Sequence, residues 1–190
     1  MVFNSWLRHR IRSALAARRR VLGGTLEALA LLLLAFVAPA VAAPPDLGDC
    51  QILHVPAGNE LAFRGYAEGV QIYRWNGNSW SFVAPEAVLY ADAGADGEVA
   101  KHYAGPTWES NSGSIVVGKV LQRCTPNPDA VPWLLLEAVR TTGPGVFHHV
   151  TYIQRLYTVG GNAPAYAGAS VGEEARVRYT AEYFFYKAED

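Results

Sequence analysis

Apolar and polar positions alternate along residues 49–187, in short runs separated by Gly, Pro or Asn. The runs are rich in Val, Ile, Tyr, Phe and Trp, which are typical of β-strands. The clearest example is 175–186, where one face carries Val177, Tyr179, Ala181, Tyr183 and Phe185 and the other carries Arg176, Arg178, Thr180 and Glu182. This period of two predicts a half-buried strand of an antiparallel sheet.

Two pairs of runs predict β-hairpins. Residues 70–75 and 79–83 flank the turn Asn76-Gly77-Asn78, and an Asn-Gly pair supplies the positive φ that a tight hairpin needs. A second hairpin is predicted to join 88–90 to 99–103.

Three further runs, 114–123, 133–140 and 146–158, are also predicted strands, although Leu, Glu and Ala in 133–140 would suit a helix. The strand at 146–158 would place the adjacent His148 and His149 on opposite faces. Roughly eight or nine short strands with frequent turns predict an all-β fold, either an antiparallel β-sandwich or a closed barrel. We expect a single domain at 49–187, a linker at 43–48 and a tail at 188–190.

The segment before this domain has the pattern of a secretory signal peptide. Six Arg residues precede an uncharged run of 16 residues, 28–43, which contains the small residues Ala40-Val41-Ala42. A membrane-spanning helix needs about 20 residues. We therefore expect residues 1–42 to be a cleaved signal, with an uncleaved anchor as the alternative. The domain would then be secreted, periplasmic or otherwise extracytoplasmic without stable membrane insertion, and the export route, general secretory or twin-arginine, stays open.

Charge is divided unevenly along the chain. The net charge is −1, but residues 43–190 hold 10 basic and 16 acidic residues, a net of −6. A body of that sign without a Lys/Arg cluster repels phosphate backbones, so nucleic acid is not an expected partner. The sequence does not indicate an oligomeric state.

The domain contains two cysteines, Cys50 and Cys124. An oxidising compartment lets such a pair close, so a disulfide between them is the first expectation. It would join the start of the domain to its middle and stabilise it by about 4.5 kcal/mol on the loop-entropy description, less any strain. The alternative is two unpaired thiols, although neither has the His neighbour or the CxxC spacing of a reactive cysteine.

Five stretches of the domain are distinctive: GVQIYRW (69–75), HYAGPTWE (102–109), PWLLLEA (132–138), VTYIQRLYTVGG (150–161) and YTAEYFFY (179–186). In order and spacing they resemble a secreted, uncharacterised family known as the domain of unknown function 3455 family. Some of its members carry the label malate dehydrogenase. The chain lacks the GxGxxG turn of a dinucleotide site, and no cofactor is expected.

The resemblance also marks two departures. Family members commonly have Cys at the position of Trp75, with a partner Cys in the region corresponding to 162–172, and commonly have Asn at the position of Tyr157. The first departure implies that the usual bridge is lost and that Cys50–Cys124 replaces it elsewhere. Because of the second departure, no role of the family's Asn is assigned to Tyr157.

Sequence motifs for catalysis and metal binding are missing. The domain's four histidines lack HxxxH spacing and its cysteines lack CxxC spacing, so no metal is expected. No GxSxG elbow presents a nucleophilic Ser, and no catalytic residue is assigned. Glu109, Glu137 and Glu182 are the carboxylates in apolar runs, and an outward strand position explains each.

The candidate ligand-binding residues are aromatic or able to form strong hydrogen bonds. The turn at Gly105-Pro106 would bring some of them together, and the 150–161 stretch would add others. They are His102, Trp108, Glu109, Trp133, Gln154 and Arg155.

Arg155 stands among apolar neighbours, so its guanidinium needs an acceptor. We expect an ion pair with Glu109, or failing that with Glu137 or Glu182. If Arg155 instead reaches a ligand, its replacement would abolish binding rather than stability.

The expected function is a non-enzymatic exported domain that binds a small ligand or a cell-surface component, in a pocket lined by Trp108 and Trp133. One alternative is a metal-free hydrolase or isomerase that uses His102 and Glu109 as acid and base, which requires the two side chains to lie within hydrogen-bond reach. A second alternative is a structural envelope protein.

Overall fold

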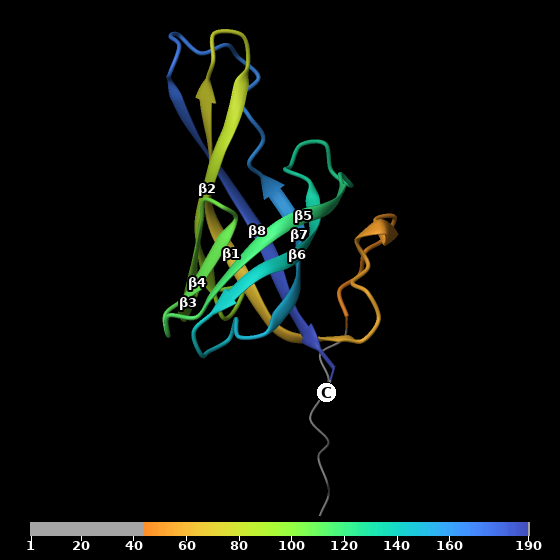
Figure 1. The fold of residues 1–190 in the computed structure, drawn as a ribbon. Helices are drawn as coiled ribbons and strands as arrows, with labels where there is room; N and C mark the ends of the chain where they lie inside the picture. The colour runs from red at the N-terminus through yellow and green to blue at the C-terminus, as the bar shows by residue number, and fades with distance from the viewer. Residues whose placement is uncertain (1–43, 190) are drawn as a thin grey trace, which may run out of the picture. The chain divides into compact units, whose positions relative to one another are not determined.

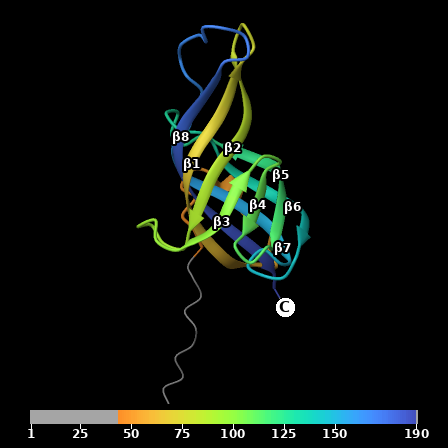
Figure 2. The ribbon, with the colours of Figure 1, turned by 90° about the vertical axis from the view of Figure 1, so that its left-hand side faces the viewer.

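Eight antiparallel strands surround a common interior and close into a barrel (Figures 1 and 2). This computed structural model describes residues 44–189. Each strand pairs with the next one in the chain, and β8 pairs with β1, so the sheet formed by the described residues has no terminal strand. A short 3-10 helix, η1 (Gln51–Leu53), precedes the strands β1 (Asn59–Trp75), β2 (Trp80–Tyr90), β3 (Glu98–Tyr103), β4 (Thr107–Ser110), β5 (Ile115–Cys124), β6 (Trp133–Thr142), β7 (Val150–Gly160) and β8 (Glu174–Ala188).

The all-β prediction is confirmed, and the strands take the closed-barrel form. Both predicted hairpins are present, because Tyr73 pairs with Phe82 across the Asn-Gly turn and Leu89 pairs with Ala100. In the first turn the Asn76 side-chain oxygen accepts hydrogen bonds from two backbone N–H groups, at 2.9 Å each.

The run at 133–140, which also suited a helix, forms most of β6. Its three consecutive leucines are all buried: Leu134 and Leu136 belong to the interior core, and Leu135 packs in a cluster outside the barrel. A strand that is buried on both faces loses the apolar and polar alternation that would identify it from sequence.

The strand predicted at 146–158 starts later than expected. Residues 143–149 form turns, and β7 begins at Val150. His149 has a positive φ of 61°, and its ring lies 3.7 Å from the ring of His148 between centroids. The prediction that these two histidines occupy opposite faces of a strand is therefore wrong, because a turn rather than a strand sets their directions.

Aromatic side chains fill the end of the barrel that carries the 143–149 turn. Phe147 and Phe185 lie 4.7 Å apart between ring centroids, and Trp108 lies 5.8 Å from Phe185. Gly118 makes room for this packing, since a Cβ atom there would lie 3.2 Å from the indole of Trp108. Of the five β8 residues predicted to share one face, four belong to the interior core: Tyr179, Ala181, Tyr183 and Phe185. The fifth, Val177, is half-buried.

A second apolar cluster lies outside the barrel, where residues 44–56 cover β6, β7 and β8. Its buried members are Leu47, Cys50, Leu53, Leu135, Leu156, Phe184 and Tyr186. The predicted disulfide is present: Cys50 is bonded to Cys124 at the end of β5, with Cα atoms 5.7 Å apart. The bridge thus joins the covering segment to the barrel wall.

The described residues contain no helix that is long and apolar enough to cross a membrane. The signal peptide predicted at 1–42 lies outside the described part of the chain.

Removing the disulfide should weaken the whole domain. The double variant Cys50→Ala/Cys124→Ala is expected to lose about 2–4 kcal/mol of unfolding free energy, because the unfolded chain gains the freedom of an open loop. Urea unfolding measures the loss, and the wild type in reductant should approach the variant's curve. Thiol alkylation of either cysteine without reductant would contradict the pairing.

Candidate functional site

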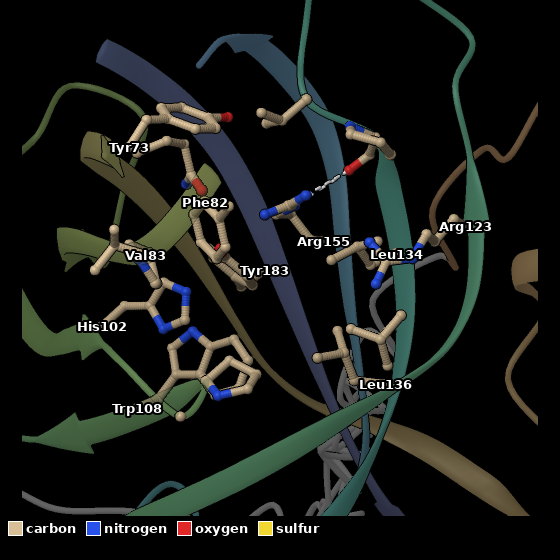
Figure 3. A pocket seen from close by; sticks show the side chains of 17 residues that line it. Tyr73, Phe82, Val83, His102, Trp108, Arg123, Leu134, Leu136, Arg155 and Tyr183 are labelled. Atoms are coloured by element: carbon tan, nitrogen blue, oxygen red, sulfur yellow. Dashed lines mark hydrogen bonds between the residues drawn. The ribbon is translucent and has the colours of Figure 1, made fainter. Parts of the chain in front are cut away.

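A cavity of about 320 Å³ lies in the barrel interior, bordered by Trp108 of the aromatic core (Figure 3). All eight strands supply its walls, together with the β3–β4 turn and the loop before β6. Its apolar lining includes Phe82, Val83, Pro85, Val120, Val131, Leu134 and Leu136. Its polar and aromatic lining consists of Gln71, Tyr73, His102, Trp108, Arg123, Arg155 and Tyr183.

Arg155, from β7, places its guanidinium in the middle of this space (Figure 3). The residue is only 9% exposed. Its Nε and Nη2 atoms donate hydrogen bonds to the carbonyl oxygen of Pro132, at 3.2 and 2.8 Å. Within residues 44–189 no carboxylate forms an ion pair with Arg155. A nearly buried positive charge therefore has neutral partners, the Pro132 carbonyl oxygen and the adjacent Tyr183 hydroxyl.

The prediction that Arg155 forms an ion pair with Glu109 is wrong. The alternative partners, Glu137 and Glu182, do not pair with Arg155 either. Glu109 faces outward from β4, where its carboxylate accepts a hydrogen bond from Tyr103 at 2.8 Å. The other two glutamates are engaged on the outer surface, Glu137 with Lys119 and Glu182 with Arg64.

Two further hydrogen-bond donors in the cavity wall have no partner. The Nε2 atom of Gln71 and the Nε1 atom of Trp108 are buried, and neither has a well-placed acceptor within the described residues, although the Tyr179 hydroxyl lies near the Gln71 amide. Gln71 and Trp108 are each 1% exposed. A buried donor without an acceptor costs about 1–3 kcal/mol, so such groups need an explanation beyond stability.

His102 forms a neutral part of the wall. Its ring stacks on Trp108 with centroids 4.3 Å apart, and its Nδ1 atom hydrogen-bonds the carbonyl oxygen of Thr107 at 2.9 Å. Complete burial lowers the pKa of His102 to about 3, and the positive charge of Arg155 acts in the same direction. Since a carbonyl only accepts, the ring proton is on Nδ1, which makes Nε2 an acceptor.

Two tyrosines border the guanidinium (Figure 3). Burial raises the pKa of both Tyr73 and Tyr183, and Arg155 lowers it to a smaller extent. Both hydroxyls therefore keep their protons at neutral pH. Tyr73 uses its proton to donate a hydrogen bond of 2.7 Å to the carbonyl oxygen of Gly161.

The cavity brings together three of the candidate residues, His102, Trp108 and Arg155. Glu109 is not among them, because the β3–β4 register pairs it with Lys101 on the outward face while His102 pairs with Trp108. The hypothesis that His102 and Glu109 act together as acid and base is contradicted, since the two side chains project from opposite faces of the sheet.

Trp133 and Gln154 also lie away from the cavity. Trp133 packs beside the outer cluster, with its ring 5.1 Å from that of Tyr157. Gln154 holds the covering segment in place: its Nε2 atom donates to the Leu53 carbonyl oxygen at 2.7 Å, and its Oε1 atom accepts from the Tyr186 hydroxyl at 2.6 Å. Both residues hold elements together on the outside of the barrel, Trp133 by packing and Gln154 by hydrogen bonds.

Sequence reasoning missed four lining residues with hydrogen-bonding side chains, namely Gln71, Tyr73, Arg123 and Tyr183. A signal for Gln71 was available. It occupies a core-facing position in the alternation of β1, between Gly69 and Tyr73, where a polar side chain has no solvent to contact. Arg123 gives no such signal, because an arginine near the end of a strand is ordinary.

Residues 44–189 contain no cluster of three or more His, Cys, Asp or Glu side chains that could hold a metal ion. The fold and site define a meandering antiparallel β-barrel with a cationic cavity in its interior. The family described as Protein of unknown function (DUF3455) matches residues 56–187, and the chain belongs to that family. No curated protein and no solved structure matches the chain.

The buried neutral His102 should make stability depend on pH. Between its folded-state pKa of about 3 and an unfolded value of about 6.5, the unfolded chain binds the extra proton, so stability falls as the pH is lowered through this range. From pH 7 to pH 4.5 the wild type should lose about 2–3 kcal/mol more than His102→Gln in urea unfolding. The exposed His148→Gln variant is the control, and equal losses in wild type and His102→Gln would refute the assignment.

Proposed function

We propose that this domain binds a small organic molecule in the cavity of its barrel. The observation that carries the proposal is a space of about 320 Å³ lined by Arg155, which has no carboxylate partner among residues 44–189, and by two residues with unpartnered buried donors, Gln71 and Trp108. A side chain that served only the fold would find its partners inside the protein.

The size and lining of the cavity support a partly apolar ligand. Ligand sites have volumes of about 300–1,000 Å³ and combine apolar walls with a few placed polar groups. Leu134, Leu136 and Val120 provide such walls here. The space would accept an aromatic ring or a short branched chain, but not a long polymer.

The rim supports entry of a ligand from solvent. Phe82 and Val83 line the cavity and are 54% and 44% exposed. They stand at the bulge where Ile72 and Tyr73 of β1 shift register against β2. Apolar side chains left in solvent beside a hollow are typical of a binding site.

Filling the cavity should abolish binding. In Val120→Trp an indole would occupy the space, whereas Leu121→Trp places the same ring on the 40% exposed neighbour. Ligand-observed NMR with indole, benzyl alcohol, benzamide and benzoate should detect binding to the wild type and to Leu121→Trp, but not to Val120→Trp. Failure of all four probes to bind the wild type, or equal binding by both variants, would contradict the proposal.

We further propose that the domain works outside the cytoplasm after export and cleavage of residues 1–42. The signal pattern in the sequence supports this location, and the Cys50–Cys124 bridge is compatible with an oxidising compartment.

Mass spectrometry of the protein from its native host should find an N-terminus at Ala43 or Pro44. Recovery of the intact Met1 form in a cytosolic fraction would overturn the proposal.

A further inference from the structure

We propose that the ligand of this cavity is an organic carboxylate whose anionic group pairs with Arg155. The inference rests on the proposed binding function and adds the chemical class of the ligand. It follows from the sign of the charges in the cavity and from the kind of hydrogen-bonding group left free there.

The cavity has positive charge and no protein anion to balance it. Arg155 and Arg123 line it, and none of its lining residues is Asp or Glu. Yet the acidic residues outnumber the basic ones over residues 43–190, so a carboxylate partner for Arg155 would not be scarce in this chain. Since buried charges in proteins are normally paired, the unpaired Arg155 indicates that the partner comes from outside.

The guanidinium is held in place with part of its hydrogen-bonding capacity unused. Its Nε and Nη2 atoms both point to the Pro132 carbonyl oxygen, and the Tyr183 hydroxyl lies within hydrogen-bonding reach of the group. These two neutral partners do not use all five of its N–H donors. The edge anchored on Pro132 fixes the plane of the group, and its other end points into the cavity (Figure 3). A planar, fixed guanidinium suits a carboxylate oxygen.

Two other lining residues, Gln71 and Trp108, carry buried donors that lack an acceptor. The donor atoms are Nε2 of Gln71 and Nε1 of Trp108. A carboxylate only accepts hydrogen bonds and offers about four lone-pair positions. A ligand ammonium group would add donors to donors and bring a second positive charge next to Arg155.

A carboxylate suits this site better than a phosphate does. Arg155 is the one deeply placed cation of the lining, since Arg123 is exposed at the rim. A dianion would leave one negative charge without a partner among Leu134, Leu136 and Val131, which is unfavourable in an apolar wall. A monoanion with an apolar body would pair its single charge with Arg155 and place its apolar part against the leucine and valine side chains.

Benzoate, benzamide and benzamidine test the inference, because they have nearly the same shape and carry a negative, a zero and a positive charge at pH 7. The wild type should bind benzoate at least about tenfold more tightly than benzamide in calorimetric titration, and benzamidine most weakly. The variant Arg155→Met should lose this preference while it still binds benzamide, which shows that the cavity remains. Arg178→Met, which removes an exposed arginine of β8, is the matched control and should keep the wild-type preference.

A second variant protects the test against misfolding. Gln71→Met keeps the length of the side chain, removes one free donor and leaves Arg155 in place; it should weaken benzoate binding and leave benzamidine binding unchanged. Equal affinity of the wild type for benzoate and benzamide, or a benzoate preference that survives in Arg155→Met, would overturn the carboxylate inference while the binding function stands. If neither these compounds nor the neutral probes bind the wild type, both proposals fail.

Discussion

The pairing of β1 with β8 is the contact on which the rest of the structure depends. It joins the first and last strands along Asn59–Arg74 and Glu174–Ala188, the most extensive register in the barrel. A barrel of eight strands encloses an interior that either side chains fill or one small ligand occupies. In this chain both occur: aromatic rings fill part of the interior, and a space remains around Arg155.

Much of the fold could be predicted from local patterns, whereas the site could not. The alternation in 175–186 and the Asn76-Gly77 turn each act within one strand or hairpin, so the sequence displays them directly. The partner of Arg155 depends on how β7 meets the loop before β6, a relation that becomes visible only in three dimensions. Glu109 illustrates the same limit, because its position next to Trp108 in sequence places it on the opposite face of β4.

The two positions that the family resemblance marks as departures, Tyr157 and Trp75, each make specific contacts in this structure. Tyr157 has a positive φ of 51° at the irregularity between β7 and β8, a backbone conformation that Asn adopts more readily than Tyr. The Tyr157 hydroxyl donates to the Asp46 carbonyl oxygen at 3.0 Å, a contact with the covering segment. Trp75 lies against Gly168, where a Cβ atom would come within 2.5 Å of the indole. Ring packing thus joins the two segments that the family's usual disulfide is expected to link.

The loop between β5 and β6 is fastened on several sides. Cys124 anchors its start through the disulfide, the Pro128 carbonyl oxygen accepts from the Asn162 side chain, and Val131 exchanges hydrogen bonds with β7 through its N–H and carbonyl groups. This loop carries the carbonyl oxygen that orients the guanidinium. A ligand of the proposed kind would therefore meet a preorganised entrance and would lose little affinity to the entropy of ordering a lid. The rate at which the ligand exchanges between the cavity and solvent would then be governed by diffusion through the opening rather than by motion of this loop.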